Sequence, residues 1–285
     1  MVYVCADDYG MTTETCRRIE ECVKYGALNR ISIFPNTEIE NITDRIPKNI
    51  SLGVHINLVE GKPLTNPQDV NLLVNDSGYF KYSFTDLFLL SVSPKRKEFE
   101  RQIYSEIKNQ IERWRNNIAT GAAVEIDSHQ HTHMIPLIFK VLMRVIKDEK
   151  INVDYIRIPS EPILPYLFTP SLYFTYKPVN LIKQWLLKFF ALINRRELKK
   201  SKISTSYFMG ILFSGKMDKK RVNKVLPYYY KLAEKNNEDI EILFHPGYLK
   251  DGESIFDENK KGFKKFYFSK DRKMEFDTLK KLKIK

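Results

Sequence analysis

The chain opens with Val2-Tyr3-Val4-Cys5-Ala6-Asp7-Asp8-Tyr9-Gly10, an apolar run that ends in two aspartates and a glycine. The β-branched and aromatic residues of 2–6 predict a strand. Residues 12–25 then carry apolar side chains at helical spacing, and Gly26 ends this helix. The opening therefore predicts a strand, an acidic turn and a helix, which is the repeating unit of an α/β fold.

The same alternation continues along the chain. Further strands are expected at 30–34, 51–58, 122–126, 155–158, 206–212 and 240–244. Helices are expected at 99–114, 137–147, 180–195 and 222–235. Strands that alternate with helices predict a mostly parallel sheet. About seven strands with polar residues at their carboxyl ends favour closure into a (β/α) barrel over an open doubly wound sheet.

The composition indicates how many domains the chain has and in which cellular compartment it works. The 285 residues are 43% hydrophobic and hold no Gly/Ser-rich or Pro-rich tract, so we expect a single domain over 1–285. The three cysteines lie in the first 22 residues without a C-x-x-C pair and are expected to be reduced thiols. A strand directly after Met1 leaves no room for a secretory signal, so a cytoplasmic enzyme is expected.

The chain is basic, with 47 Lys and Arg against 35 Asp and Glu and a net charge of +12. Much of the excess lies in 195–202 and 260–285. Such a field can attract polyanions or anionic lipid. Because no nucleic-acid motif accompanies it, we interpret these stretches as solvated helix faces and a charged tail, and expect no nucleic-acid partner.

Residues 180–195 form an unusually apolar helix with a narrow polar stripe at Gln184, Lys188 and Arg195. The run is shorter than the about 20 apolar residues that span a bilayer. Three interpretations remain: a buried core helix, an oligomer contact, or a helix at a membrane surface. The basic residues of 195–202 keep the membrane interpretation open.

The adjacent Asp7 and Asp8 stand between a strand and a helix. Neighbouring side chains on an extended strand point to opposite faces, so only a turn lets both reach one pocket. There, one carboxylate could hold a metal while the other acts as a base. For the pair taken alone, a helix N-cap is the simpler interpretation.

All five histidines lie in three motifs, G-V-H-I-N-L (53–58), D-S-H-Q-H-T-H (127–133) and F-H-P-G (244–247). His55 alone is more often a hydrogen-bonded core residue than a ligand. In an extended segment the second motif would alternate four side chains onto one face: Asp127, His129, His131 and His133. Imidazoles with a carboxylate suit Zn²⁺, Fe²⁺, Mn²⁺ or Co²⁺ and predict a metal site. His245 could be a ligand or a general acid.

The motifs A-D-D-Y-G, G-V-H-I-N-L, D-S-H-Q-H-T-H and F-H-P-G occur in this order between Ala6 and Gly247. Together they resemble the YdjC-like carbohydrate deacetylases, the family of chitooligosaccharide deacetylase. The resemblance implies a distorted (β/α) barrel whose metal is held by one Asp and two His, here Asp8, His55 and His129. It also implies Asp7 as the catalytic base, which leaves His245 as the candidate acid.

Other positions are expected to contact the substrate or to orient the ligands. Arg157-Ile158-Pro159, with Glu161, is similar to the R-x-P segment of the family. Asp127 is expected to orient His129 or His131. This set of residues comprises Asp127, His131, Arg157 and Asn57. The apolar segment of about 163–202 has no counterpart in the family pattern and is expected to be an insertion near the sugar cleft.

The expected function is a metal-dependent hydrolase that removes the N-acetyl group of an amino sugar and releases acetate. Asp7 would take the proton of a metal-activated water and His245 would protonate the departing amine. The ligand set favours Zn²⁺, while the resemblance implies Mg²⁺ as a further candidate. A homodimer and a peripheral membrane contact through 180–202 are also expected. The alternatives are a metal-dependent phosphoesterase and a deacetylase-like protein that binds membranes or polyanions.

Overall fold

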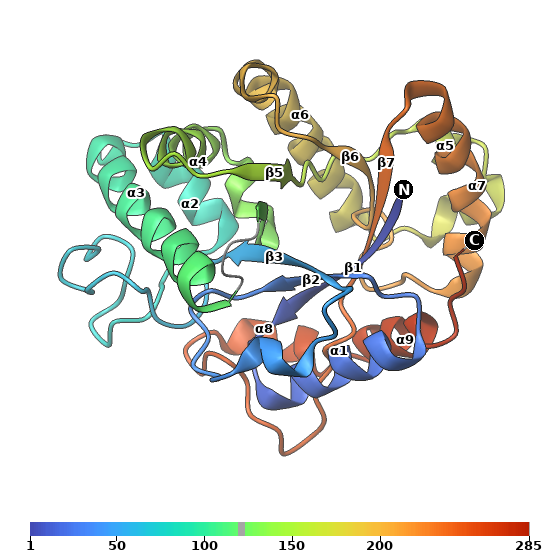
Figure 1. Ribbon diagram of the computed structural model, residues 1–285, viewed down its shortest axis with the longest axis horizontal. Coiled ribbons are helices and arrows are strands. Elements are labelled where there is room, and N and C mark those ends of the chain that lie inside the picture. Colours follow the sequence, from blue (N-terminus) through green and yellow to red (C-terminus); the bar gives the residue numbers. More distant parts are fainter. Residues whose placement is uncertain (119–122, 285) are drawn as a thin grey trace.

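Seven parallel strands form a curled sheet at the centre of the molecule, in the order β5-β4-β3-β2-β1-β7-β6 (Figure 1). The computed structural model describes residues 1–118 and 123–284. The strands are β1 (Val2–Tyr9), β2 (Arg30–Ile33), β3 (Ser51–Ile56), β4 (Val124–Ser128), β5 (Val153–Ile156), β6 (Ser206–Met209) and β7 (Asp239–Phe244).

The two edges of this sheet meet through Ser204. The backbone N–H of Ile156 donates to the carbonyl of Ser204, and the N–H of Ser204 donates to the carbonyl of Asp154, both at 3.1 Å. Ser204 lies just before β6, so β5 and β6 are joined by a single bridge rather than by a full ladder. The predicted α/β fold, a distorted (β/α) barrel of about seven parallel strands, is therefore confirmed.

Helices surround the sheet on its outer side (Figure 1). They are α1 (Thr13–Tyr25), α2 (Phe84–Ser91), α3 (Arg96–Arg113), α4 (Pro136–Asp148), α5 (Leu164–Leu167), α6 (Pro178–Ser201), α7 (Lys219–Asn236), α8 (Lys261–Tyr267) and α9 (Lys270–Leu279). Four short turns of other helix types join them: η1 (Ile42–Arg45), η2 (Trp114–Ile118), η3 (His129–Met134) and η4 (Pro170–Thr175). Within 1–118 and 123–284, no helix has the length and apolar character needed to cross a bilayer.

The expected strands and helices are all present, with shifted bounds. The strand expected at 122–126 is β4, which begins at Val124; Ala122 lies outside the described residues. β1 and β4 continue through the polar residues of their motifs, because buried ion pairs satisfy those side chains inside the sheet. The apolar face predicted for 99–114 from its spacing, namely Ile103, Ile107, Ile111 and Trp114, is buried, with Trp114 in the η2 turn that follows α3.

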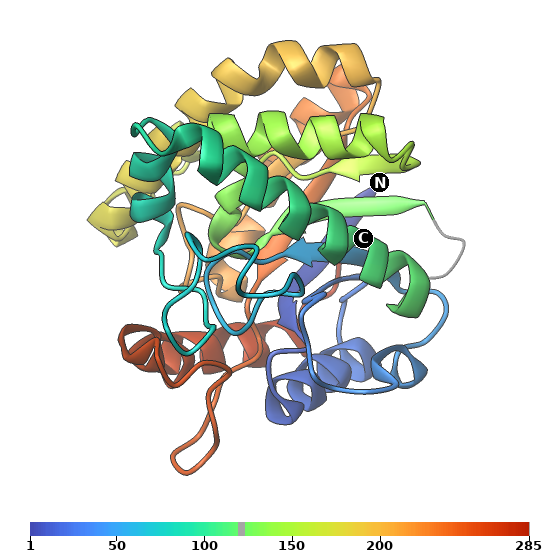
Figure 2. The ribbon, with the colours of Figure 1, turned by 90° about the vertical axis from the view of Figure 1, so that its left-hand side faces the viewer.

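α6 lies on the outside of the molecule beside α4 (Figure 2). Leu187 and Phe190 are buried, yet Ile182, Trp185 and Phe189 are 69%, 62% and 58% exposed. The interpretation of this segment as a core helix is therefore wrong for its apolar face. The inner face is instead held by polar side chains, of which Gln184 exchanges two hydrogen bonds with the backbone of Glu161.

Glu161 fixes the chain that follows β6. Its buried carboxylate accepts from the backbone N–H groups of Gly210, Ile211 and Leu212 at 2.5, 3.0 and 2.9 Å. Replacing it with alanine would leave three donors without their partner, and each buried unsatisfied donor costs about 1–3 kcal/mol.

We therefore expect Glu161→Ala to lower the free energy of unfolding by about 3 kcal/mol or more, measured by urea denaturation. Glu258→Ala is the matched control, because Glu258 is exposed. Equal stability of the two variants would contradict this role of Glu161.

Candidate metal centre

Asp7 and Asp8 both lie inside β1, and the backbone of Asp8 has a positive φ of 70°. The register between β1 and β2 shifts at this point, between Ala6 and Tyr9. This irregularity breaks the alternation of an extended strand and lets both carboxylates be buried in one region. The alternative of a helix N-cap is wrong, because Thr12 caps α1 by accepting from the N–H of Thr15.

Asp8, His55 and His129 come together at the carboxyl ends of β1, β3 and β4. Asp8 Oδ1 is 3.1 Å from His129 Nδ1 and 3.6 Å from His55 Nε2. Ligand atoms at about 2.0–2.1 Å around a tetrahedral Zn²⁺ are about 3.3 Å apart. These spacings suit one divalent ion, and the three residues are those that the motifs indicated.

His55 Nε2 gives the sharpest test of whether an ion fits. It is buried and has no hydrogen-bond partner among residues 1–118 and 123–284. The other ring nitrogen, Nδ1, is 2.5 Å from Asp127 Oδ1. A buried imidazole nitrogen without a partner, aimed at a carboxylate, has the arrangement of a metal ligand.

Each histidine of the trio is oriented by a carboxylate on its far side. Asp127 holds His55, not His129 or His131 as expected from the sequence. Glu60 Oε1 lies 2.8 Å from His129 Nε2. Such carboxylate partners fix the orientation of the ring and raise its basicity as a ligand.

Asn57 and Tyr267 hold Glu60 in turn. The Asn57 side chain accepts from the N–H of Val59 and donates to the carbonyl of Glu60, which shapes the loop after β3. The hydroxyl of Tyr267 donates to Glu60 Oε1. Asn57 was predicted to contact the substrate or to orient the ligands, and here it positions the carboxylate behind His129.

Arg272 of α9 pairs with the second oxygen of Asp8, with Nη2 at 2.5 Å from Oδ2. Its Nη1 donates to the carbonyl of Gly247. Arg272 and Glu275 are buried, so 260–285 also contributes to the interior, while lysines such as Lys264 and Lys281 are exposed as expected. Sequence reasoning missed Arg272, Tyr267 and Glu60, and only Glu60, two residues beyond the G-V-H-I-N-L motif, carried a signal.

These pairs set the charges of the three candidate ligands. Burial opposes ionisation of Asp8, but Arg272 and the neighbouring imidazoles of His129 and His55 hold its pKa well below the usual range. Burial alone would lower the pKa of His55, but Asp127 and Asp7 outweigh it and raise that pKa to about 10. Burial is likewise outweighed at His129, whose pKa is raised by Asp8 and Glu60.

The guanidinium of Arg157 lies beside this trio, fully buried within the barrel. It contacts Asp7 at 2.7 Å, Asp127 at 2.8 Å and Glu241 at 2.7 Å. Other groupings of acidic side chains around Asp7, Asp127 and Glu241 thus already hold a cation. The predicted importance of Arg157 is explained by this position, which binds a candidate base and an orienting carboxylate together.

The histidines after β4 do not share one face. The chain leaves the extended conformation after Ser128, and Gln130 and His131 have positive φ angles of 53° and 59°. The expectation of one face shared by Asp127, His129, His131 and His133 is therefore wrong. His133 lies against Ser128 Oγ and the carbonyl of Arg157, and burial lowers its pKa to about 4.

His245 and His131 are the two remaining imidazoles. His245 follows β7, where Phe244 pairs with Ala6, so it lies beside Asp7 in the register of the sheet. Its Nδ1 is 3.7 Å from Glu275 Oε2. Burial, Arg157, His133 and His245 hold the pKa of His131 well below its usual range, so His131 is neutral.

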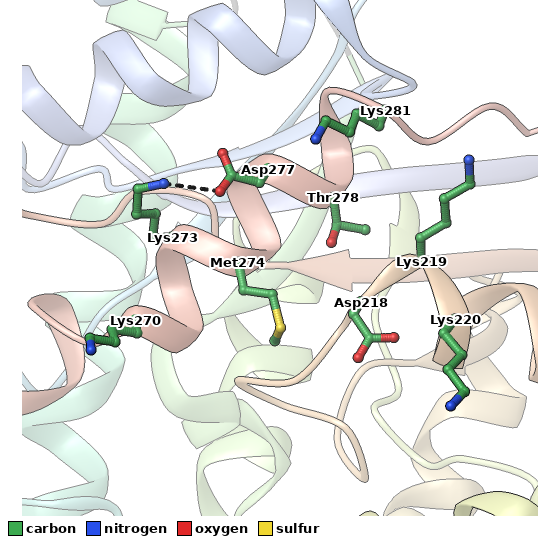
Figure 3. A pocket seen from close by; sticks show the side chains of 9 residues that line it. All are labelled: Asp218, Lys219, Lys220, Lys270, Lys273, Met274, Asp277, Thr278 and Lys281. Atoms are coloured by element: carbon green, nitrogen blue, oxygen red, sulfur yellow. Dashed lines mark hydrogen bonds and ion pairs between the residues drawn. The ribbon is translucent and has the colours of Figure 1, made fainter.

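A separate hollow of about 570 Å³ lies on the outer side, between the start of α7 and α9 (Figure 3). Its basic lining residues are Lys219, Lys220, Lys270, Lys273 and Lys281. None of the candidate ligands lines it, and Lys273 is already paired with Asp277. The hollow is not part of the metal centre.

Comparison with known proteins agrees with the family that the motifs indicated. A family model described as YdjC-like protein matches residues 1–285. A curated relative in Danio rerio is 29% identical over 173 residues, which cover 59% of this chain and 53% of the relative. One in Thermoanaerobacter pseudethanolicus is 34% identical over 131 residues, covering 44% of this chain and 48% of the relative. Both relatives are named carbohydrate deacetylase, and the chain spans about half of their length.

The solved structure of an Enterococcus faecalis V583 protein, named for cellobiose-phosphate cleavage, has a similar fold. The TM-score is 0.60 at 17% identity, and the match covers 98% of this chain and 94% of that chain. At this identity the similarity concerns the fold alone.

Metal binding is expected to release protons and to strengthen as pH rises. With a pKa of about 10, His55 carries a proton at neutral pH in the metal-free protein, and a metal needs the neutral ring. The affinity for Zn²⁺ should rise roughly tenfold per pH unit for each proton released. Calorimetric titration at pH 6, 7 and 8 in buffers of different ionisation enthalpy measures both quantities. An affinity independent of pH would contradict the arrangement.

Glu60→Ala is expected to weaken Zn²⁺ binding about 10–100-fold, because His129 loses the carboxylate that orients it. Competition with a chromogenic chelator measures the loss. Glu258→Ala, at an exposed position, is the control and should bind as the wild type does. Equal affinity of the two variants would show that Glu60 does not act on the site.

Proposed function

The chain belongs to the YdjC-like protein family, and from this premise we propose that it is a metal-dependent deacetylase of N-acetylated amino sugars. The reaction would hydrolyse the acetamide, releasing acetate and leaving a free amine on the sugar. The observation that carries this proposal is the trio Asp8, His55 and His129, with a carboxylate behind each imidazole. The naming of the curated relatives as carbohydrate deacetylases supports the substrate class.

One divalent ion is proposed for this trio, with Asp8, His55 and His129 as its ligands. A bound ion would polarise the acetamide carbonyl and lower the pKa of a bound water. Two imidazoles and one carboxylate favour Zn²⁺ among the divalent ions, and Mg²⁺ is the second candidate. Asp127 and Glu60 would keep both rings facing the ion.

Asp7 is proposed as the general base. It is adjacent to the ligand Asp8 and lies 4.0 Å from His55 Nδ1, measured to Oδ2. Arg157 donates to both of its oxygens, at 2.7 and 2.9 Å, which fixes the carboxylate in one orientation. In this role Asp7 takes a proton from the attacking water.

His245 is proposed as the general acid. An amine leaves an amide only when it is protonated, so a proton donor must stand opposite the base. The register of β7 on β1 places His245 beside Asp7, and Glu275 lies 3.7 Å from its Nδ1. Glu275 would orient the imidazole for the transfer. His131, held neutral, is proposed to contact the sugar rather than to donate the proton.

A phosphoesterase is less consistent with the same residues. Two-metal phosphatase sites place their ions about 3.5–4 Å apart and need carboxylates that bridge them. The neighbouring acidic residues Asp7, Asp127 and Glu241 are engaged by Arg157 instead. A stoichiometry of one ion per chain is therefore expected, and two ions would favour the phosphoesterase.

The expectations on domain organisation, location and partners stay predictions. They are a single domain over 1–285, an insertion at about 163–202 beside the cleft, and a cytoplasmic location. A homodimer and a peripheral membrane contact through 180–202 compete for the exposed apolar side of α6.

Acetate release from di-N-acetylchitobiose and longer N-acetylglucosamine oligomers tests the activity. The metal-loaded protein should release acetate, and a chelator should stop it. Asp8→Asn and His55→Ala should lose both metal and activity. Asp7→Asn should keep the metal but lower kcat about 100-fold or more, the range for loss of a general base.

Asp251→Asn, at an exposed position, is the matched control and should leave acetate release unchanged. No acetate from any acetylated sugar, with one ion bound per chain, would refute the proposed function. Full activity of Asp7→Asn would refute only the role of Asp7.

A further inference from the structure

Exposed large hydrophobic side chains are concentrated in one short part of the chain. Of the 17 that the described residues expose, 12 lie between Leu164 and Ile193. Seven of these belong to α6 and are called here the α6 apolar face: Val179, Leu181, Ile182, Trp185, Phe189, Leu192 and Ile193. Single exposed apolar residues are ordinary, but a gathering of this size marks an interaction surface.

α6 is held with this face outward by polar side chains on its inner side. Asn180 donates to the carbonyls of Leu212 and Ser214, at 3.2 and 3.1 Å. At the other end Asn194 donates to the carbonyl of Met134 at 2.9 Å. A helix that rotated to bury its apolar side would break these hydrogen bonds and leave buried carbonyls unpaired. The outward orientation is therefore specified by the fold.

The α6 apolar face forms a continuous stripe. Ile182, Trp185, Phe189 and Leu192 follow one another at steps of three or four residues, which places them on one side of the helix. From Ile182 to Ile193 the helix rises about 17 Å, roughly half of the about 30 Å hydrocarbon thickness of a bilayer. The stripe suits a surface along which the helix lies flat.

The charged residues of α6 are nearly all basic. α6 contains six Lys or Arg and one acidic residue, Glu197, which is paired with Lys200. Arg196 and Lys200 continue the stripe toward the end of the helix, at the same helical spacing. Long basic side chains can lie along an apolar surface while their charged ends reach anionic groups.

A second copy of the chain is a poor partner for this surface. A two-fold contact brings the same helix against itself, and α6 offers only Glu197, already paired with Lys200, to the six basic residues of the other copy. The net charge of +12 on each copy also opposes their association. The surface needs a partner that buries its apolar stripe and neutralises its flanking basic residues. An anionic lipid surface does both.

We propose that the α6 apolar face docks this protein on an anionic lipid bilayer, with α6 lying flat in the interface and Trp185 and Phe189 inserted. The N-terminal half of α6 is bound to Glu161 and to the chain after β6. Those segments follow the carboxyl ends of β5 and β6, the end of the barrel that carries the metal centre. The N-terminal half of the docked helix is therefore attached to the end of the barrel that carries the metal centre.

Co-sedimentation of the full chain with vesicles tests the docking. Vesicles of phosphatidylcholine with about 30% phosphatidylglycerol are compared with phosphatidylcholine alone, and at least tenfold tighter binding to the anionic vesicles is expected. Trp185→Ser/Phe189→Ser should weaken this binding at least tenfold. Tyr25→Ser removes an aromatic side chain of similar exposure, 57% against 62% for Trp185, and should leave binding unchanged.

Fluorescence separates insertion from adsorption by charge. Of the two tryptophans, Trp114 is fully buried and Trp185 is exposed, so a blue shift on adding anionic vesicles reports on Trp185. Arg196→Glu/Lys200→Glu should weaken binding more than Lys219→Glu/Lys220→Glu. The two pairs change the net charge equally, and the second pair lies at the start of α7, where it lines the separate basic hollow.

Several outcomes would overturn the proposal. They are no binding to anionic vesicles, binding unaffected by Trp185→Ser/Phe189→Ser, or equal effects of the two charge pairs without a blue shift. A stable dimer in light scattering that these apolar substitutions dissociate would assign the face to a second copy. Because vesicle binding needs no substrate, each outcome is independent of the deacetylase assay.

Discussion

The buried guanidinium of Arg157 is the interaction on which the interior of this barrel depends. Asp7, Asp127 and Glu241 come from three different strands, and their carboxylates would repel one another in a medium of low polarity. Arg157 contacts all three within 2.8 Å. Removing one partner of such a network leaves an uncompensated buried charge. The free-energy cost of that charge is far larger than the net stabilisation that the ion pair provides.

This network also connects the fold to the candidate chemistry. Asp127 binds Arg157 with one oxygen and His55 with the other, so the position of a candidate ligand is set by the core of the barrel. Ser32 donates to the same carboxylate. The trio of Asp8, His55 and His129 is thus preorganised by groups that the interior needs for its own electrostatic balance.

Much of this architecture could be predicted from the sequence, because the alternation of strands and helices and the ends of the strands are local patterns. The bend after Ser128 could not, since the left-handed conformation of Gln130 and His131 has no local glycine to indicate it. Glu60 and Arg272 acquire their roles only when distant segments meet. The sequence left the orientation of α6 open for a related reason: the polar residues that fix it, such as Asn180, bind backbone carbonyls of other segments.

The pairing of Asp8 with Arg272 has a consequence for biosynthesis. Asp8 lies on the first strand, and its guanidinium partner is 264 residues further along the chain. Until α9 has emerged and packed against the barrel, Asp8 lacks its main counter-charge, and Tyr267 cannot reach Glu60. A nascent chain can therefore assemble its strands before α9 has been made, but its metal centre matures only after α9 has packed against the barrel. C-terminal truncation would produce a barrel without a finished site.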